Sequence, residues 1–257
     1  MLRMHYLLMS LAFLPFLAMA QSDSIGIVDD YHDVALCEDT CRHIHGIDIS
    51  HYQGKVFWET LGKNRRTTYV YLKATEGGNR IDSYYADNIR QAHQQDILVG
   101  SYHYFRPQIP TAVQLKNFTM QCRPEDQDLL PLIDVETLGK LDDDAFRDSL
   151  ICFLHLVEDY YHAKPLVYSG RNFYNKHLQH TLDDYPLMIA MYHSAEPPLL
   201  DDGCPIVVWQ YTGQGCIEGV NGYVDKSRFL GHHRLREILY SPKTATDAPY
   251  FLPKRDI

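Results

Sequence analysis

The chain has 257 residues and carries 33 acidic and 24 basic side chains, which gives a formal net charge of −9 at pH 7. This acidic balance argues against a nucleic-acid partner, because contact with phosphates needs a basic surface. It also gives no reason to expect attraction to an anionic polymer. The length suits one large barrel or two small domains.

The first 20 residues have the pattern of a secretory signal peptide. Arg3 precedes an apolar stretch over 7–17, and Ala18-Met19-Ala20 matches the A-x-A pattern of a cleavage site. The apolar stretch is short for a membrane span, so no stable membrane insertion is expected. We therefore expect a chain that starts near Gln21 and is exported to the periplasm or the exterior. Cleavage removes one base and no acid, so the formal charge changes from −9 to −10.

All six cysteines follow this segment, at positions 37, 41, 122, 152, 204 and 216. An even number of cysteines in an exported chain is typical of disulfides. Buried free thiols explain the same count equally well in a chain of this size. The sequence therefore leaves the pairing open.

Beyond a polar extension over 21–44, apolar runs alternate with helical patterns. Strands are predicted at 44–49, 69–72, 97–105, 129–136, 165–169, 187–192, 206–211 and around Val224, and helices at 57–61, 84–94, 111–122, 142–161 and 172–178. This alternation indicates a parallel sheet, and about eight strands suggest an α/β fold, an irregular TIM-like (β/α)-barrel with few helices in its last third. We place the barrel at 45–230 and expect the tail, 231–257, to wrap the surface or to be partly disordered.

The stretch 129–136 is the most informative part of the chain, because an apolar run ends there in Asp134 and Glu136. A strand buried on both faces of a sheet has this composition. Side chains alternate across a strand, so the two carboxylates point to the same face, with Cα atoms about 6–7 Å apart. Such close carboxylates cannot ionise independently, and one pKa is pushed up. This arrangement suits a proton donor beside a charge stabiliser, as in the cleavage of glycosidic bonds, although a solvated acidic loop would have the same sequence.

Other polar side chains follow the predicted strands, at the end of a barrel where active sites lie. They are Asp48, Glu76, Arg106, Tyr168, Tyr192, Gln210, Tyr211 and Asp225. Carboxylates, tyrosines and an amide at one face suit a sugar, because aromatic rings stack on pyranoses and acids bind hydroxyls. Simpler roles remain open: tyrosines are often half-buried, Glu76 can pair with Lys73, and Trp209 fits the core better than a ligand platform.

Six segments resemble the motifs of one family, in order and at plausible spacing. They are 45–54 (HGIDISHYQG), 71–77 (YLKATEG), 100–107 (GSYHYFRP), 131–136 (PLIDVE), 209–212 (WQYT), and 219–225 at Gly219, Val220, Val224 and Asp225. Over about 45–229 the chain is similar to the glycoside hydrolase family 25 lysozymes. One such motif says little, but six in order are specific. Tyr52 and Met188 stand where the family usually has tryptophan, which leaves the sugar preference open.

The resemblance implies an enzyme that hydrolyses the β-1,4 bond between N-acetylmuramic acid and N-acetylglucosamine in peptidoglycan, without a metal or cofactor. By motif position it implies Glu136 as general acid, Asp134 as stabiliser of the positive intermediate, and Asp48 and Asp225 as supporting acids. Retention of configuration with help from the N-acetyl group of the substrate is also implied. The partner is then a peptidoglycan glycan strand, and the side chains expected to bind it are Tyr102, Tyr104, Tyr168, Tyr192, Trp209 and Gln210. We further expect neighbouring strands to bury Glu136 in part.

Two alternatives remain open from the sequence. A metal-dependent barrel hydrolase would use His43-Ile44-His45, with His51 and His103 as further ligands. His43 and His45 precede the apolar core of the first strand, however, and so belong to the end opposite the carboxylates. A non-catalytic peptidoglycan-binding module would keep the fold without the reaction. The intact carboxylate pair at 134 and 136 argues against that module.

Overall fold

The computed structural model describes residues 45–64 and 67–241. Its centre is a ring of strands in the order β1-β9-β8-β7-β6-β5-β4-β2, which pairing of β1 with β2 closes. The strands are β1 (His45–Ile49), β2 (Thr67–Glu76), β4 (Leu98–Tyr104), β5 (Leu132–Asp134), β6 (Leu166–Gly170), β7 (Leu187–Ala190), β8 (Val208–Gly215) and β9 (Val224–Phe229), with β3 (Arg80–Ile81) paired to β2 outside the ring. The predicted α/β barrel is confirmed. The signal segment, the extension over 21–44 and the tail beyond 241 lie outside the described residues.

Strand direction explains why the connection between β8 and β9 has no helix. The ring is parallel throughout except at β9, which runs antiparallel to both β1 and β8. A parallel neighbour requires a long crossover, whereas an antiparallel neighbour is reached by a short connection. The chain therefore passes from β8 to β9 through a loop, and no crossover helix is needed there.

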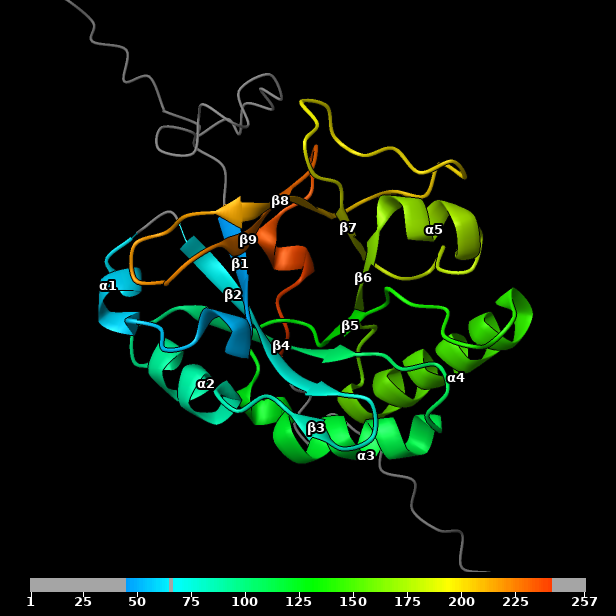
Figure 1. The fold of residues 1–257 in the computed structure, drawn as a ribbon, viewed down its shortest axis with the longest axis horizontal. Coiled ribbons are helices and arrows are strands. Elements are labelled where there is room, and N and C mark those ends of the chain that lie inside the picture. The colour runs from blue at the N-terminus through cyan, green and yellow to red at the C-terminus, as the bar shows by residue number, and fades with distance from the viewer. Residues whose placement is uncertain (1–44, 65–66, 242–257) are drawn as a thin grey trace, which may run out of the picture.

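The helices cover one side of the barrel. They are α1 (Trp58–Gly62), α2 (Tyr85–His93), α3 (Thr111–Gln121), α4 (Asp143–Tyr161) and α5 (Arg171–His177). Helices α2, α3 and α4 lie along the same side of the sheet, and α5 lies beside β6 (Figure 1). Helix α4 starts as its sequence predicts: the Asp142 side chain accepts from the Ala145 N–H at 2.9 Å, and Asp143 and Asp144 favour the positive end of the helix dipole.

The strand predicted over 129–136 is shorter in the structure, where β5 spans Leu132–Asp134. Its first half has two partners: Leu129 N donates to Val99 O of β4 at 3.1 Å, while Leu130 N donates to Ile238 O at 2.8 Å and Leu129 forms a bridge with Leu239. Pro131 follows, and proline has no N–H to donate to a sheet. The apolar pattern marked burial correctly, but burial here comes from two different neighbours.

Tyrosines fill the interior of the barrel and glycines make room for them. Tyr69 and Tyr71 of β2 are fully buried, and the Tyr69 hydroxyl is hydrogen-bonded to Ser227 Oγ at 3.0 Å. A Cβ on Gly46 would lie 2.0 Å from the Tyr69 ring, and one on Gly100 would lie 2.3 Å from the Tyr71 ring. The two glycines therefore sit where each tyrosine ring crosses a neighbouring strand, which is the use of glycine for close approach.

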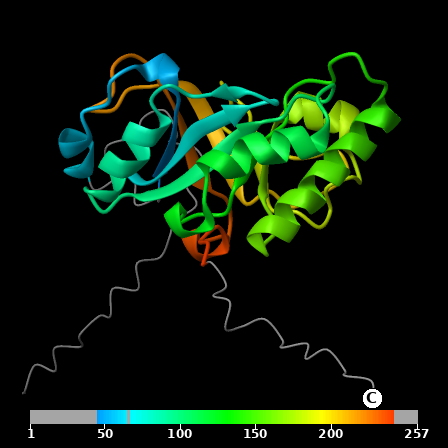
Figure 2. The same ribbon diagram turned by 90° about the horizontal axis from the view of Figure 1, so that it is seen from below.

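The C-terminal segment 231–241 closes the end of the barrel opposite the strand ends described below. Ile238 is fully buried and packs with Tyr69, Tyr71 and Leu129 in the interior cluster, and Tyr240 N donates to Asp128 O at 2.8 Å. Figure 2 shows this red segment at the lower end of the barrel. This described part of the tail is therefore a plug on the barrel floor.

Candidate active site

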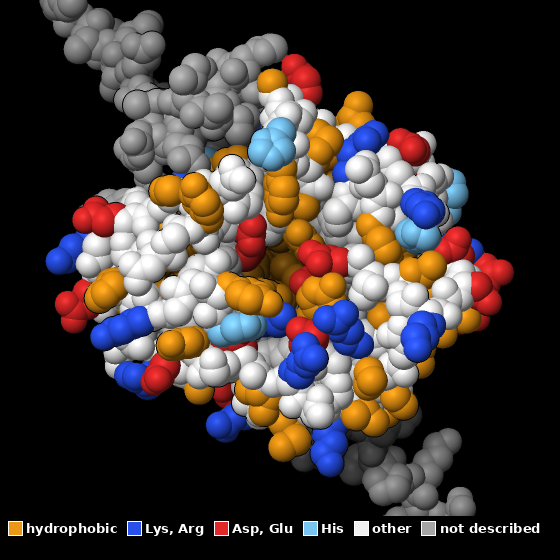
Figure 3. Space-filling model, in the orientation of Figure 1, with side chains coloured by type: hydrophobic (Ala, Val, Ile, Leu, Met, Phe, Trp, Pro, Cys, Tyr) orange, Lys and Arg blue, Asp and Glu red, His pale blue; other side chains and the backbone are white. Residues whose placement is uncertain are grey.

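The carboxyl ends of the strands surround a cavity of about 220 Å³. It is lined by the carboxylates of Asp48 from β1, Asp134 from β5, Glu136 just beyond β5, and Asp225 from β9. Asp48 and Asp225 are register partners across β1 and β9. Val135 is fully buried in the outer core, so Asp134 and Glu136 share the inner face, as strand alternation predicts. Acidic side chains accordingly lie at the edge of a central hollow (Figure 3).

Gln210 on β8 holds Asp48 and two tyrosines in place. Its amide nitrogen donates to Asp48 Oδ2 at 2.6 Å. Its amide oxygen accepts from the hydroxyls of Tyr168 at 2.9 Å and Tyr192 at 2.5 Å. With two donors on the oxygen and an acceptor at the nitrogen, only one orientation of the amide satisfies all three bonds. The network therefore fixes one wall of the cavity.

Two buried carboxylate oxygens, Asp48 Oδ1 and Asp134 Oδ1, have no hydrogen-bond partner within the described part of the chain. A buried polar atom without a partner costs free energy, and such atoms are rare outside functional sites. Both acids line the cavity, so both oxygens are placed to accept hydrogen bonds from a ligand.

The pKa values of the buried acids are shifted upward. Burial, with the charge of Glu136, raises the pKa of Asp134 well above its usual range against the opposing charge of Lys73. Burial and the charge of Asp225 raise the pKa of Asp48 to about 8, and burial with the charge of Glu136 raises that of Asp225 to about 6. The cavity therefore retains protons near neutral pH, which is a mark of acid–base chemistry.

Three tyrosines supply neutral hydroxyls to the cavity. Burial and nearby carboxylates raise the pKa values of Tyr102, Tyr104 and Tyr168 well above the usual range, so all three stay protonated. The Tyr104 hydroxyl is hydrogen-bonded to Glu136. Neutral phenols can both donate to and accept from sugar hydroxyls.

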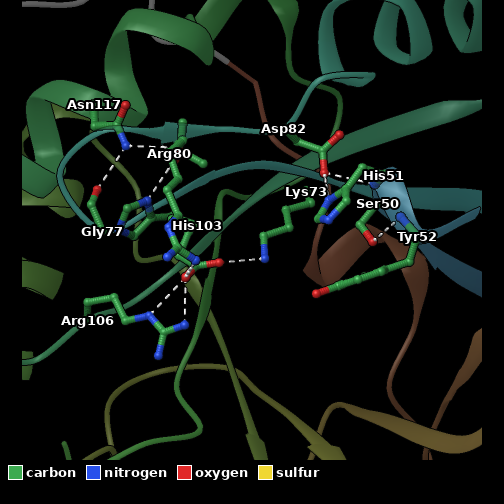
Figure 4. Close-up of polar contacts among 12 residues, drawn as sticks. Ser50, His51, Tyr52, Lys73, Gly77, Arg80, Asp82, His103, Arg106 and Asn117 are labelled. Carbon is green, nitrogen blue, oxygen red and sulfur yellow. Dashed lines mark hydrogen bonds and ion pairs between the residues drawn. The ribbon is translucent and has the colours of Figure 1, made fainter. Parts of the chain in front are cut away.

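The turn after β1 forms one rim of the cavity. Ser50 and Gln53 form a reciprocal capping box around the 3-10 turn His51–Gln53. His51 Nδ1 donates to the buried Asp82 Oδ2 at 2.7 Å, and the Tyr52 ring lies 4.2 Å from the His51 ring with 82% of its surface exposed (Figure 4). The turn therefore presents the exposed ring of Tyr52 at the rim. This is the position at which the family usually has tryptophan.

A bulge in β2 places Glu76 on the same side of the sheet as Lys73. Lys73 is the register partner of Tyr102, Thr75 of His103 and Glu76 of Tyr104, so one residue is inserted between Lys73 and Thr75. Glu76 is bonded to Lys73 at 2.9 Å, to Arg80 at 2.9 Å and to Arg106 at 2.6 Å. Burial alone would raise its pKa, but the hydrogen bonds and charges of Arg106 and Lys73 outweigh burial and lower it to about 2. Glu76 is thus the buried anchor of three cations.

The structure places most of the predicted residues at the cavity and corrects two expectations. Asp48, Asp134, Glu136, Asp225, Tyr102, Tyr104, Tyr168 and Gln210 line it, and Tyr192 contacts it through Gln210. Trp209 does not: it is fully buried in the outer core and donates to Met191 O at 2.8 Å, because its neighbour Gln210 faces inward. The partial burial expected for Glu136 is also wrong, since this side chain is exposed at the mouth.

Sequence reasoning missed the lining residues Ser50, Gln53, Lys73 and Leu132, and it noted Tyr52 and Met188 only as departures from the family pattern. Lys73 had a usable signal, because it follows Tyr69 and Tyr71 at alternate positions of one strand. Met188 gave none beyond its place in a motif, and it is fully buried beneath the carboxylates.

The structure does not assemble the metal site of the first alternative. His103 is buried on the outer side of β4 between Thr75 and Gln114, whereas His51 is bound to Asp82 and His45 to Tyr211. His43 lies outside the described residues. Within the described ranges, one other group has metal-ligating atoms close together: His180, Asp183 and Asp202. The carboxylate of Asp202 already accepts from Tyr174 and from two backbone N–H groups.

The described cysteines are free: Cys122 is buried, Cys204 is half-buried, and Cys152 and Cys216 are exposed. Cys37 and Cys41 lie outside the described residues. None of the helices in 45–64 and 67–241 is long and apolar enough to span a bilayer.

Comparison with known proteins connects this site to a family. The family model for Glycosyl hydrolases family 25 matches residues 47–220. The protein YegX of Escherichia coli K12 is 34% identical over 192 residues, which cover 73% of this chain and 70% of YegX. The autolytic lysozyme of Clostridium acetobutylicum is 34% identical over 188 residues, which cover 72% of this chain and 55% of that protein.

A solved structure agrees with this match. The family 25 glycosyl hydrolase from Bacillus anthracis is 26% identical, with a TM-score of 0.68 over 74% of this chain and 90% of that one. The family match runs from β1 beyond β8 and thus contains the strands that carry Asp48, Asp134 and Glu136. The chain therefore belongs to glycosyl hydrolases family 25 and is a glycoside hydrolase.

Proposed function

We propose that the protein is a lysozyme that hydrolyses the β-1,4 bond between N-acetylmuramic acid and N-acetylglucosamine in peptidoglycan, with Glu136 as proton donor and Asp134 as the acid that stabilises the intermediate. The observation that carries the proposal is the pairing of an exposed Glu136 with a buried Asp134 in one cavity. The 34% identity to an autolytic lysozyme supports the choice of substrate.

The two acids divide the reaction by their positions. In the free protein the pair holds a proton, because burial raises the pKa of Asp134. When the acetamido N–H of bound muramic acid donates to the free Oδ1 of Asp134, the ionised form of Asp134 is favoured. Glu136 lies at the mouth of the cavity, where the leaving oxygen arrives, and is therefore the acid placed to give that oxygen a proton. Asp48, Asp225 and Gln210 hold the opposite wall.

Retention of configuration follows from the acetamido group in this proposal. Its carbonyl oxygen attacks C1 as the bond from C1 to the leaving O4 breaks, and Glu136 gives its proton to O4. Water then attacks C1 of the cyclic intermediate while Glu136 takes back a proton, so two inversions restore the configuration. The tyrosines that we expect to bind the sugar are Tyr102, Tyr104, Tyr168 and Tyr192, beside Gln210. Nuclear magnetic resonance of the first-formed anomer tests this step, and an inverted product contradicts it.

Mass spectrometry of soluble fragments from digested peptidoglycan tests the function itself. We expect fragments that end in reducing N-acetylmuramic acid, because the bond on its C1 is the one cleaved. Fragments that end in reducing N-acetylglucosamine would assign a different bond. Binding to walls without release of any fragment would favour the non-catalytic module.

We also infer that the chain acts outside the cytoplasm, in the periplasm or the exterior, after removal of residues 1–20. The A-x-A pattern that ends at Ala20 supports this, as does a substrate that lies outside the membrane. N-terminal sequencing of protein from the native host is expected to begin near Gln21. A chain that begins at Met1 contradicts the inference.

A further inference from the structure

Lys73, Arg80 and Arg106 gather on the carboxylate of Glu76, and we name these three side chains the cationic rim. Lys73 lines the cavity, and the two arginines lie beyond its lining. Lys73 binds Glu76 Oε2 at 2.9 Å, while Arg80 at 2.9 Å and Arg106 at 2.6 Å bind Oε1 (Figure 4). Glu76 neutralises one of the three positive charges, and Lys73 also faces Asp134. The excess positive charge therefore lies on the two arginines, in a chain whose formal net charge is −9.

The two arginines keep unused hydrogen-bond donors at the surface. Within the described chain, Arg80 uses Nη1 on Glu76, and its side chain is 73% exposed. Arg106 uses Nε and Nη2 on Glu76, is 38% exposed, and lies over the Tyr104 ring at 4.4 Å. A guanidinium carries five N–H donors in a planar fork that matches a carboxylate. Each guanidinium is therefore held on Glu76 by some of its N–H groups. The remaining N–H groups can bind a second carboxylate.

The need to neutralise Glu76 does not explain why three cations gather on it. Its pKa is lowered to about 2, so it is ionised at any working pH, and Lys73 already gives it a partner inside the cavity. Arg80 extends from the two-residue strand β3 to Glu76 Oε1, the oxygen that Arg106 also binds, while its side chain remains mostly in solvent. Exposed ion pairs of this kind add little to stability. A ligand gives the second and third cations a function.

The strand register places the rim next to the catalytic acids. Glu76 is the register partner of Tyr104, and Tyr104 of Asp134, across β2, β4 and β5. Neighbouring strands are about 4.8 Å apart, so Glu76 lies roughly 10 Å from Asp134. A substituent on the sugar bound at Asp134 can span this distance. Lysine and arginine side chains accordingly lie beside the acidic hollow (Figure 3).

We propose that the cationic rim binds the carboxylates of the acidic peptide carried on the lactyl group of N-acetylmuramic acid, so that the enzyme prefers peptide-bearing glycan to bare glycan. The inference rests on the lysozyme function proposed above. The lactyl group is attached to the carbon next to the one that bears the acetamido group, so a muramic acid with its acetamido group at Asp134 directs its peptide toward a neighbouring strand. The rim supplies a bidentate site for a peptide carboxylate there.

The test compares kcat/KM on soluble glycan strands that carry their peptides with kcat/KM on the same strands after an amidase has removed the peptides. We expect the wild-type enzyme to prefer peptide-bearing strands. Arg80→Gln should lower this preference about five- to tenfold, close to the usual worth of a single hydrogen bond, and chiefly through KM. Arg80→Glu should lower it further, and added salt should reduce the wild-type preference because screening weakens exposed charges.

Arg90→Gln is the matched control. Arg90 on α2 is also exposed, at 57%, and also binds a carboxylate, but this is Asp87 at 3.0 Å and not Glu76, so Arg90 is no part of the cationic rim. This variant should keep the wild-type preference. If Arg80→Gln and Arg80→Glu also keep it while reducing muramic acid is still released, the rim has no peptide role and the lysozyme function stands. If the wild type releases no fragment from either substrate, the proposed function itself fails.

Discussion

Asp134 and Glu136 are two positions apart on the inner face of the barrel, yet one is buried and the other is exposed. The difference decides which acid can meet a leaving group. Asp134 lies among Tyr102, Tyr168 and Lys73, where it can accept from the substrate. Glu136 lies at the mouth beside the Tyr104 hydroxyl, where a bound glycan would cover it.

Glu136→Gln should reduce wall turnover about 10²–10⁴-fold, the usual worth of general acid catalysis, because the amide keeps the shape and has no acidic proton. Wall binding should be largely retained. An activated aryl glycoside, if accepted, should show a smaller defect, because its leaving group needs less protonation. The measurement is turnover of both substrates by folded wild type and variant.

Glu125→Gln is the control for this change, because Glu125 is 63% exposed in the turn Pro124–Asp126 and lies outside the cavity. It should turn over walls at the wild-type rate. If Glu136→Gln digests walls within a few-fold of wild type while folded, the proton donor is another residue.

Asp48→Asn should make the protein more stable above neutral pH and less active. The pKa of Asp48 is raised to about 8 from 3.8, so the folded chain holds this proton more tightly than the unfolded chain. The corresponding stability is fully present below about pH 4 and is lost as the pH rises through 8. Asparagine cannot ionise and can still accept from Gln210. At pH 8 the gain should be on the order of a few kcal/mol, since each pKa unit is worth about 1.4 kcal/mol.

The measurement is the melting temperature of both proteins between pH 4 and pH 9. The difference should grow with pH, while Asp184→Asn, a change at a side chain that is 87% exposed, should leave the profile as it is. If the melting temperatures of wild type and Asp48→Asn change with pH in parallel, ionisation of Asp48 does not destabilise the folded protein, and the prediction is wrong. Wall turnover measured on the same samples should fall in Asp48→Asn. A buried acid in an active site lowers stability but serves the reaction, so its removal raises stability and reduces activity.

The sequence predicts the catalytic acids well because each follows a strand-forming run, and strand ends meet at one face of a barrel. It predicts exposure poorly. Nothing in the order of residues says that the chain leaves the sheet at Asp134, so the exposure of Glu136 could not be foreseen. For Trp209 the composition favoured the core, which is confirmed, and the assignment to substrate binding was wrong. Its position beside Gln210 admits either face until the register of β8 is known.

At the scale of the element, the pairing of glycine with tyrosine on adjacent strands can be tested by overpacking. Gly46→Ala should lower the free energy of unfolding by at least about 1–3 kcal/mol, because its Cβ would lie 2.0 Å from the Tyr69 ring. The measurement is the urea midpoint. Gly170→Ala is the control, since no atom lies within 4 Å of a Cβ there. Equal midpoints for the two variants would mean that the Tyr69 ring moves aside without cost.

The bulge in β2 shows what alternation cannot predict. Strict alternation from Lys73 would place Glu76 on the outer face, because the two residues are three positions apart. The inserted residue between Lys73 and Thr75 returns Glu76 to the inner side, where it collects the cationic rim. A bulge is defined by how two strands pair, so it cannot be predicted from the sequence of one strand alone.

For the whole molecule, closure of the barrel floor depends on the segment 231–241. Ile238→Ala should lower the free energy of unfolding by about 2–5 kcal/mol, because this fully buried side chain would leave a cavity beneath Tyr69 and Tyr71. Leu239→Ala is the matched control at the next position, where the side chain is 45% exposed. The midpoints of chemical unfolding compare the two. A loss that is equal in both variants would contradict the plug.

The barrel itself could be predicted because strands and helices of ordinary length alternate through most of the chain. The plug could not be predicted, since the only full turn of regular structure in 231–241 is the 3-10 turn Leu235–Glu237. Ile238 and Leu239 are adjacent apolar residues, and the sequence does not say which of them is buried. The burial of Ile238 is decided by the open end of a barrel assembled from residues far away in the chain. The composition predicts a polar tail, but tertiary packing buries Ile238 of this tail in the barrel interior.

The antiparallel strand β9 sets the order in which this protein can fold. It closes the ring by pairing with β1, so the first and the last strand of the described chain must meet before Asp48 and Asp225 become neighbours. Contacts so distant in sequence form slowly, because the entropy of closing a long loop is lost before any pairing compensates for it. Helices α2 and α3 pack against strands close to them in the chain, α4 packs against α3, and all three can form earlier. During refolding, helical content therefore returns first, and catalytic competence returns only with ring closure.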